Sequence, residues 1–146
     1  MRHARSLVCT ILLTLIASSA FAAGSTDLTV QANVLGTCSF DAAAYTMDFG
    51  NLDPAAAADT NATAQLDFTC ANGTAYTIDN VAGARSMAGA TDTLPYSIAA
   101  YANTGTGSGV SQSVTLTGTV LAVDYDIASG RAAEAYAEVI TININP

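Results

Sequence analysis

Apolar and polar residues alternate with a period of two along much of this chain. The clearest case is the segment 136–146, where one face carries Tyr136, Ile140, Ile142 and Ile144 and the other carries Thr141, Asn143 and Asn145. That pattern is typical of a half-buried β-strand, because successive side chains of a strand point to opposite faces of its sheet. The segment is therefore expected to be the closing strand of the fold.

The same alternation occurs near the other end of the chain. Leu28, Val30, Ala32 and Val34 would share one face of a strand over residues 28–34. With strand-forming segments at both ends and little chemistry between them, the chain is expected to pair with other copies of itself.

Further strand signals lie between these ends, separated by short connections. The turn pair Asn72-Gly73 predicts a hairpin between 64–70 and 76–81. Residues 83–93 and 103–112 are expected to be loops, and 53–59 a loop or a single helical turn. The remaining strand-like segments are 28–40, 45–50, 94–101 and 113–127, the last of which could divide into two near Gly118. About seven strands with no long helix predict an all-β fold, an immunoglobulin-like antiparallel sandwich.

The first 22 residues have the pattern of a secretory signal peptide. A positive start with Arg2 and Arg5 precedes a short apolar run, and an Ala-x-Ala site ends at Ala22. An uncleaved membrane anchor is the alternative, but the run at 7–17 is too short to span a bilayer. The predicted organisation is a signal peptide at 1–22, a donor or first strand within 23–37, and a sandwich domain at 38–146, with no membrane insertion of the mature chain.

Charge narrows the possible partners. After cleavage the chain would keep only Arg85 and Arg131 as basic residues, against all 12 acidic ones, and it has no lysine. Binding to nucleic acid or to anionic lipid by basic patches is excluded. The acidity is consistent with solubility outside the cell.

Two cysteines, Cys38 and Cys70, would remain in the mature chain. A secreted domain with two cysteines most simply forms one disulfide, although two free thiols are the alternative. The bond would close a loop of about 30 residues and stabilise the fold by about 3–4 kcal/mol in the chain-entropy model.

Little catalytic chemistry is possible with these residues. The one histidine, His3, would leave with the signal peptide, so neither a Ser-His nor a Cys-His nucleophile can form, and the usual zinc and copper ligands are missing. Asp124 and Asp126 would share a strand face and could form a carboxylate pair, or could simply be two solvated acids near a turn. We expect no enzyme activity, no metal and no cofactor.

Several motifs together identify a family resemblance. The chain resembles the spore coat protein U domain family, which includes subunits of archaic chaperone–usher pili. The likeness covers nearly the whole mature chain and rests on the order of Cys38, Asp48-Phe49-Gly50, Phe68-Thr69-Cys70, Leu94-Pro95-Tyr96 and Tyr136-Ala137-Glu138.

This resemblance implies donor-strand complementation. The sandwich would lack one edge strand, and a periplasmic chaperone would fill the gap until an outer-membrane usher replaces it with the N-terminal segment of another subunit. Leu28, Val30, Ala32 and Val34 would form the donor strand. The acceptor groove would be walled by Tyr136, Ile140, Ile142 and Ile144. In the alternative, 28–34 is an ordinary first strand of a complete sandwich.

The sequence thus predicts a structural pilus subunit, exported through the periplasm to the cell surface and supporting adhesion or biofilm formation. A self-sufficient secreted coat or adhesin domain that binds carbohydrate or matrix is the second hypothesis. A small hydrolase that uses Asp124 and Asp126 is the third.

Overall fold

The computed structural model describes residues 24–56 and 58–146. The predicted signal peptide, residues 1–22, lies outside these residues. The chain divides into two units, Met1–Asn33 and Val34–Pro146. In the first unit, residues 24–33 are exposed and form neither helix nor strand.

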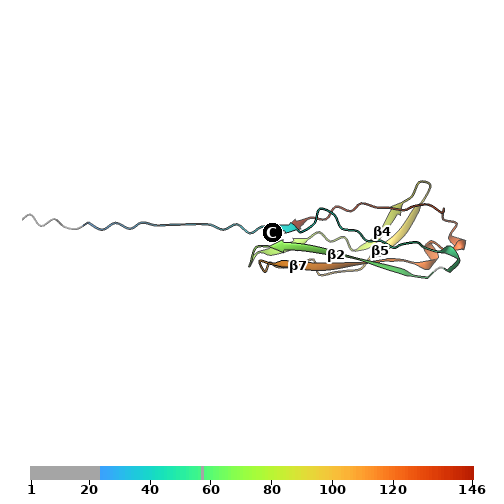
Figure 1. Cartoon of the computed structure of the whole chain (residues 1–146), viewed down its shortest axis with the longest axis horizontal. Helices are drawn as coiled ribbons and strands as arrows, with labels where there is room; N and C mark the ends of the chain where they lie inside the picture. The colour runs from blue at the N-terminus through green and yellow to red at the C-terminus, as the bar shows by residue number, and fades with distance from the viewer. Residues whose placement is uncertain (1–23, 57) are drawn as a thin grey trace, which may run out of the picture. The chain divides into compact units, whose positions relative to one another are not determined.

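The second unit is all-β and consists of two antiparallel sheets, as the sequence predicted (Figure 1). The larger sheet has the order β1-β2-β7-β5-β4, with bounds Cys38–Phe40, Thr60–Cys70, Ser111–Val120, Thr93–Ile98 and Gly83–Ala88. The smaller sheet has the order β6-β3-β8, with bounds Thr104–Thr106, Ala75–Ile78 and Ile144–Asn145. The described part of the second unit also contains three short 3-10 helices, η1 (Pro54–Ala56), η2 (Ala122–Asp124) and η3 (Ile127–Ser129).

Alternation along the strands builds the core. Every second residue of β2 is buried, namely Ala62, Ala64, Leu66, Phe68 and Cys70. Strands β7 and β5 of the same sheet add the same kind of row, with Leu116 and Val120 from β7 and Leu94, Tyr96 and Ile98 from β5. Such rows exclude water from one face of the sheet, and each fully buried large side chain stabilises the fold by about 1.5–3 kcal/mol.

The disulfide between Cys38 and Cys70 is present. The two cysteines lie directly opposite each other where β1 pairs with β2, and their Cα atoms are 4.1 Å apart. Cys70 is fully buried. The bond holds the short strand β1 at the edge of the larger sheet.

Two connections differ from the predictions. Residues 83–88 are not a loop but strand β4, which pairs along its whole length with β5. The predicted hairpin between 64–70 and 76–81 is also wrong. After the turn at Gly73, with φ +79°, the chain crosses to the other sheet, where β3 pairs with β6 and β8. Strand β6 lies within the predicted loop 103–112.

The expected break near Gly118 does not occur, because β7 runs through it to Val120. This glycine serves close packing instead. A Cβ atom placed on it would overlap the Met47 side chain and lie 2.8 Å from Phe49 Cζ. An added side chain at this position would require the ends of the Met47 and Phe49 side chains to shift.

Three segments predicted as strands are extended but mostly unpaired. Only Cys38–Phe40 of 28–40 and only Ile144–Asn145 of 136–146 are strands, and 45–50 contains none. Their alternation is as expected, with the odd-numbered residues of 137–145 exposed. What they lack is a neighbouring strand to complete the hydrogen bonds. This absence defines the site described next.

Candidate functional site

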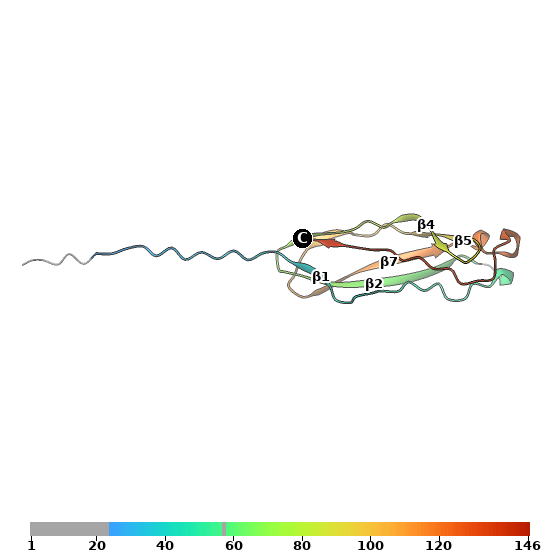
Figure 2. The same ribbon diagram turned by 90° about the horizontal axis from the view of Figure 1, so that it is seen from above.

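Two extended segments lie over the larger sheet and form the walls of the candidate site. The first wall is residues 42–50 and the second wall is residues 136–142. Figure 2 shows both running along the length of the sheet. Their side chains pack on the core, since Tyr45, Met47, Phe49, Ile140 and Ile142 all contact its buried cluster.

The main chain of both walls is largely unpaired. Asp41 N–H donates to Asp67 C=O at 2.9 Å, and Ala88 and Ala137 exchange hydrogen bonds of 2.9 and 3.0 Å. The next backbone hydrogen bond lies just after the second wall, from Asp79 N–H to Asn143 C=O, at 2.9 Å. Within the described chain, residues 42–50 and 138–142 make no backbone–backbone hydrogen bond. Free donors and acceptors of this kind are what an added strand would pair with.

An apolar groove of about 680 Å³ lies between the walls. Its floor is formed by Ala64 and Leu66 of β2, Leu116 of β7, and Tyr96 and Ile98 of β5. The walls add a further row of side chains, which includes Phe40, Tyr45, Met47, Phe49, Tyr136, Ile140 and Ile142. The floor side chains are themselves buried, so the groove lies directly on the core.

The first wall is anchored by Tyr45. Its hydroxyl donates to Asp67 C=O at 2.5 Å and accepts from Asp67 N–H at 3.2 Å, just beyond the part of β2 that pairs with β1. Met47 and Phe49 then pack on Gly118. These contacts hold the segment over the sheet although it has no strand partner.

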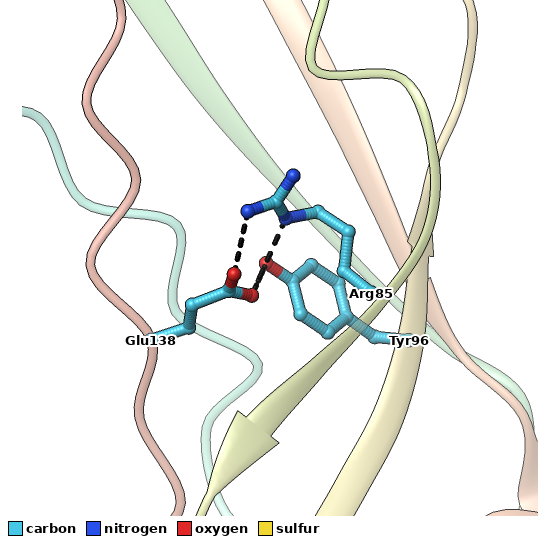
Figure 3. A network of polar contacts seen from close by, with 3 residues as sticks. All are labelled: Arg85, Tyr96 and Glu138. Carbon is cyan, nitrogen blue, oxygen red and sulfur yellow. Dashed lines mark hydrogen bonds and ion pairs between the residues drawn. The ribbon is translucent and has the colours of Figure 1, made fainter.

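The second wall is anchored by a charged cluster at Glu138 (Figure 3). Arg85 Nη2 of β4 lies 2.5 Å from Glu138 Oε1, and Tyr96 Oη of β5 donates to Glu138 Oε2 at 2.6 Å. The Arg85 guanidinium lowers the pKa of the Glu138 carboxyl, and the Tyr96 hydroxyl adds to this effect. The carboxylate therefore stays ionised and holds the second wall to the β4–β5 hairpin.

A second cluster fixes the start of this wall. The Tyr136 hydroxyl donates to Asp92 Oδ1, while Ala132 N–H donates to Asp92 Oδ2 at 3.2 Å. Partial burial, together with the neighbouring Asp92 carboxylate, raises the pKa of Tyr136 to about 12. The hydrogen bond from Tyr136 in turn lowers the pKa of Asp92. Glu134 Oε1 accepts from the N–H groups of Thr91 and Asp92, at 3.1 and 3.2 Å.

The structure places the predicted acceptor residues as follows. Tyr136, Ile140 and Ile142 line the groove. Ile144 instead lies in β8, opposite Ile78 of β3. That these residues accept a strand stays a prediction.

The predicted donor residues are exposed. The exposed fractions of Leu28, Val30 and Val34 are 86%, 83% and 90%, and Ala32 is exposed as well. Every residue that lines the groove belongs to the second unit of the chain.

Sequence reasoning missed the first wall and the role of Glu138. The alternation of Tyr45, Met47 and Phe49 could have identified the wall as an apolar face. Glu138 interrupts the apolar face of the second wall, and such an interruption indicates a buried or paired charge. The partner Arg85 could not be found, because residues 83–93 were read as a loop. Tyr96 lay in the predicted strand 94–101, but no local pattern connects it with Glu138.

Asp124 and Asp126 do not form the carboxylate pair that was considered as an alternative. Asp124 ends η2 and accepts a 2.7 Å hydrogen bond on its main-chain oxygen from Arg131 Nε, whereas the Asp126 side chain caps η3 by accepting from Ser129 N–H at 2.7 Å. They do not share a strand face. Among residues 24–56 and 58–146, no group of three or more His, Cys, Asp or Glu side chains could hold a metal ion.

No helix in the described part of the chain is both long and apolar enough to cross a membrane. No curated protein and no solved structure matches the chain. The family model of the Spore Coat Protein U domain does match, over residues 25–143. That range includes both walls of the groove and the exposed segment with Leu28. The chain therefore belongs to the Spore Coat Protein U domain family, whose members are structural domains of the coat and fimbrial type.

Proposed function

We propose that this protein is a structural subunit of a surface pilus that polymerises by donor-strand exchange and supports adhesion or biofilm formation. One copy supplies residues 28–34, and another copy receives them in the groove between its two walls. Export proceeds through the periplasm, where a chaperone protects the groove until an outer-membrane usher brings the next copy.

The observation that carries the proposal is the open groove itself. Its floor is core, with Leu66 and Leu116 facing it, and both walls have unpaired main chain. A strand edge with unpaired main chain favours aggregation unless another strand covers it. A strand supplied from outside satisfies the main-chain hydrogen bonds and fills the apolar pockets together.

The exposed N-terminal segment has the properties of such a strand. Leu28, Val30, Ala32 and Val34 alternate with polar residues, and the three larger ones are more than four-fifths exposed. Seven residues in extended conformation span about 23 Å, and the second wall, 136–142, has the same number of residues. The segment is long enough to pair along that whole wall.

Strand donation between copies gives a filament. The donating segment and the receiving groove are different surfaces of one chain, so the contact is head-to-tail and repeats without closing. Each copy in the filament has its groove filled by a neighbour and offers its own segment to the next.

Deleting residues 23–34 tests the proposal. We expect the shortened chain, co-expressed with its chaperone and usher, to fold and to bind the chaperone but not to extend fibres, which electron microscopy and shearing of cells would show. Val30→Asp in the full chain should have the same effect, because burying an unpaired carboxylate is costly. Thr29→Asp, on the polar face of the segment, is the matched control and should still permit fibres.

Normal fibres from the deletion variant would disprove strand donation by this segment. Purified chain that stays monomeric and soluble without a chaperone would support a self-sufficient coat or adhesin domain instead.

A further inference from the structure

The end of the larger sheet that carries the 3-10 helices has a cavity of its own. Figure 2 shows η1, η2 and η3 gathered at the end that lies away from β1. A cavity of about 460 Å³ is lined there by Pro54 of η1 and by residues 131–136, which follow η3. It adjoins the groove, since Met47, Phe49 and Tyr136 line both. We call it the end cavity, and its volume is within the roughly 300–1,000 Å³ of small-ligand sites.

Polar side chains distinguish the end cavity from the groove. Among the described residues, Asp48, Asn51, Arg131 and Glu134 line the end cavity and do not line the groove. Covering these groups with apolar side chains would be costly, because they would lose hydrogen bonds to water without replacement. The end cavity therefore suits a polar occupant, whereas the groove suits apolar side chains.

Two charged side chains of the end cavity are held in place by hydrogen bonds to main chain. Arg131 Nε donates to Asp124 C=O at 2.7 Å. Glu134 Oε1 accepts from the N–H groups of Thr91 and Asp92, at 3.1 and 3.2 Å. Both Arg131 and Glu134 are half-buried. These contacts fix the positions of the two side chains, which lowers the entropy cost of binding a ligand.

Each of these groups keeps atoms that no protein partner uses. Asp48 shares this property, because its Oδ1 accepts from Gly50 N–H at 2.8 Å while its Oδ2 is free. Within the described chain, Arg131 Nη1 and Nη2 and Glu134 Oε2 likewise make no hydrogen bond. The end cavity thus offers donors on one side chain and acceptors on two others.

We propose that the end cavity binds one neutral sugar ring. The Arg131 guanidinium donates to hydroxyl oxygens of the sugar, and the free oxygens of Asp48 and Glu134 accept from its hydroxyl groups. Met47 and Phe49 supply apolar surface for the C–H groups of the ring. Small-ligand sites commonly combine an apolar lining with a few placed polar groups in this way.

Charge selects a neutral ligand over an ion. Two carboxylates, those of Asp48 and Glu134, line the cavity with the single guanidinium of Arg131, so an anion meets net negative charge. An organic cation meets the guanidinium, which stays charged in proteins and repels it. A sugar carries donors and acceptors on one ring, and it satisfies both kinds of group without adding charge.

The inference goes beyond the proposed function and does not rest on strand donation. Every residue that lines the end cavity belongs to the second unit of the chain. A fibre subunit and a self-sufficient domain would therefore both carry the site. Sugar binding and strand donation can each fail without the other.

Saturation-transfer NMR tests the proposal on assembled fibres and on the secreted monomer of the full mature chain. The probes are glucose, galactose, mannose and N-acetylglucosamine. We expect at least one of them to bind with a Kd on the order of 1 mM, as suits a ligand of this size. The uronate and the protonated amino derivative of the same sugar should bind at least about tenfold more weakly, because each adds a charge.

Variants locate the binding. Asp48→Asn keeps an acceptor for Gly50 N–H but replaces the free oxygen by an amide nitrogen, and it should raise the Kd about tenfold. Arg131→Met keeps the apolar stem without the guanidinium and should do the same, with the thermal midpoint as the check on folding. Asp53→Asn is the matched control and should stay within about twofold. Asp53 accepts from Ala55 N–H at 2.9 Å in the same manner but lines neither cavity.

Binding of a neutral sugar by either form of the chain, weakened by Asp48→Asn and not by Asp53→Asn, would support the site. If none of the neutral sugars binds to fibres or monomer, the proposal is wrong, and the fibres themselves still report on strand donation. Tighter binding of the uronate or the amino derivative would overturn the assignment to a neutral ligand. Equal affinity in Asp48→Asn, Arg131→Met and the natural chain would overturn the end cavity as the place of binding.

Discussion

Single residues determine how closely the first wall lies on the sheet. Gly118 is buried beneath Met47 and Phe49, and any Cβ atom there would overlap both. Its φ is not in the left-handed region, so the requirement for glycine is steric and not conformational. The close packing of Met47 and Phe49 on β7 therefore depends on the absence of a side chain at position 118.

We expect Gly118→Val to displace the first wall and to lower the free energy of unfolding by about 1–3 kcal/mol, the usual cost of overpacking. Chemical denaturation of the disulfide-bonded chain would measure the change. Thr115→Val places the same residue type at an exposed position of the same strand, where it meets no wall, and should shift stability by less than about 0.5 kcal/mol. Equal stability of Gly118→Val and the natural chain would show that Met47 and Phe49 do not lie where described.

At the scale of elements, the second wall is held more by side chains than by strand pairing. Between Ala137 and Asn143 its fixed point is Glu138, which is bound by Arg85 and Tyr96. An element held in this way can accept a new strand without first breaking an existing one. Its attachment to the β4–β5 hairpin should also respond to pH.

We expect acid to loosen the second wall. The pKa of Glu138 is lowered from its ordinary value of 4.5, chiefly by Arg85. A carboxylate with a lowered folded-state pKa contributes stability above its unfolded pKa and loses it as pH falls through the folded value. Asp92, with its pKa lowered by Tyr136, acts in the same direction. The thermal unfolding midpoint should thus fall between about pH 5 and pH 3.

Glu138→Gln should lack part of this acid response, because the glutamine cannot be protonated in that range. At neutral pH it should cost less than about 1 kcal/mol, as expected for a partly exposed ion pair. Asp27→Asn, in the exposed N-terminal segment, serves as the control for the loss of one carboxylate. An unchanged acid response in Glu138→Gln would exclude this carboxylate as its source.

The same elements show what sequence could predict and why the rest escaped it. Alternation identified β2, the apolar face of 136–144 and the disulfide-bearing strands, because period-two burial is a local signal. It could not tell a paired strand from an extended segment without a partner, since both alternate. The residues of β4, Gly83–Ala88, alternate weakly, and its partnership with β5 brings Arg85 to Glu138. That contact joins residues 53 positions apart, beyond the reach of any local pattern.

For the whole molecule, net charge should control the rate at which copies meet. The chain from Ala23 onward carries 12 acidic residues against Arg85 and Arg131. Two such subunits repel each other, and salt screens that repulsion within about 10 Å at 0.1 M.

We therefore expect fibre growth to accelerate several-fold when sodium chloride is raised from about 0.05 to about 0.3 M, as followed by light scattering. Sucrose at matched osmolarity is the control for effects that are not electrostatic. Growth that slows with salt would instead mean that attraction between opposite charges guides assembly, and the acidic surface would then need a basic partner that the mature chain cannot provide.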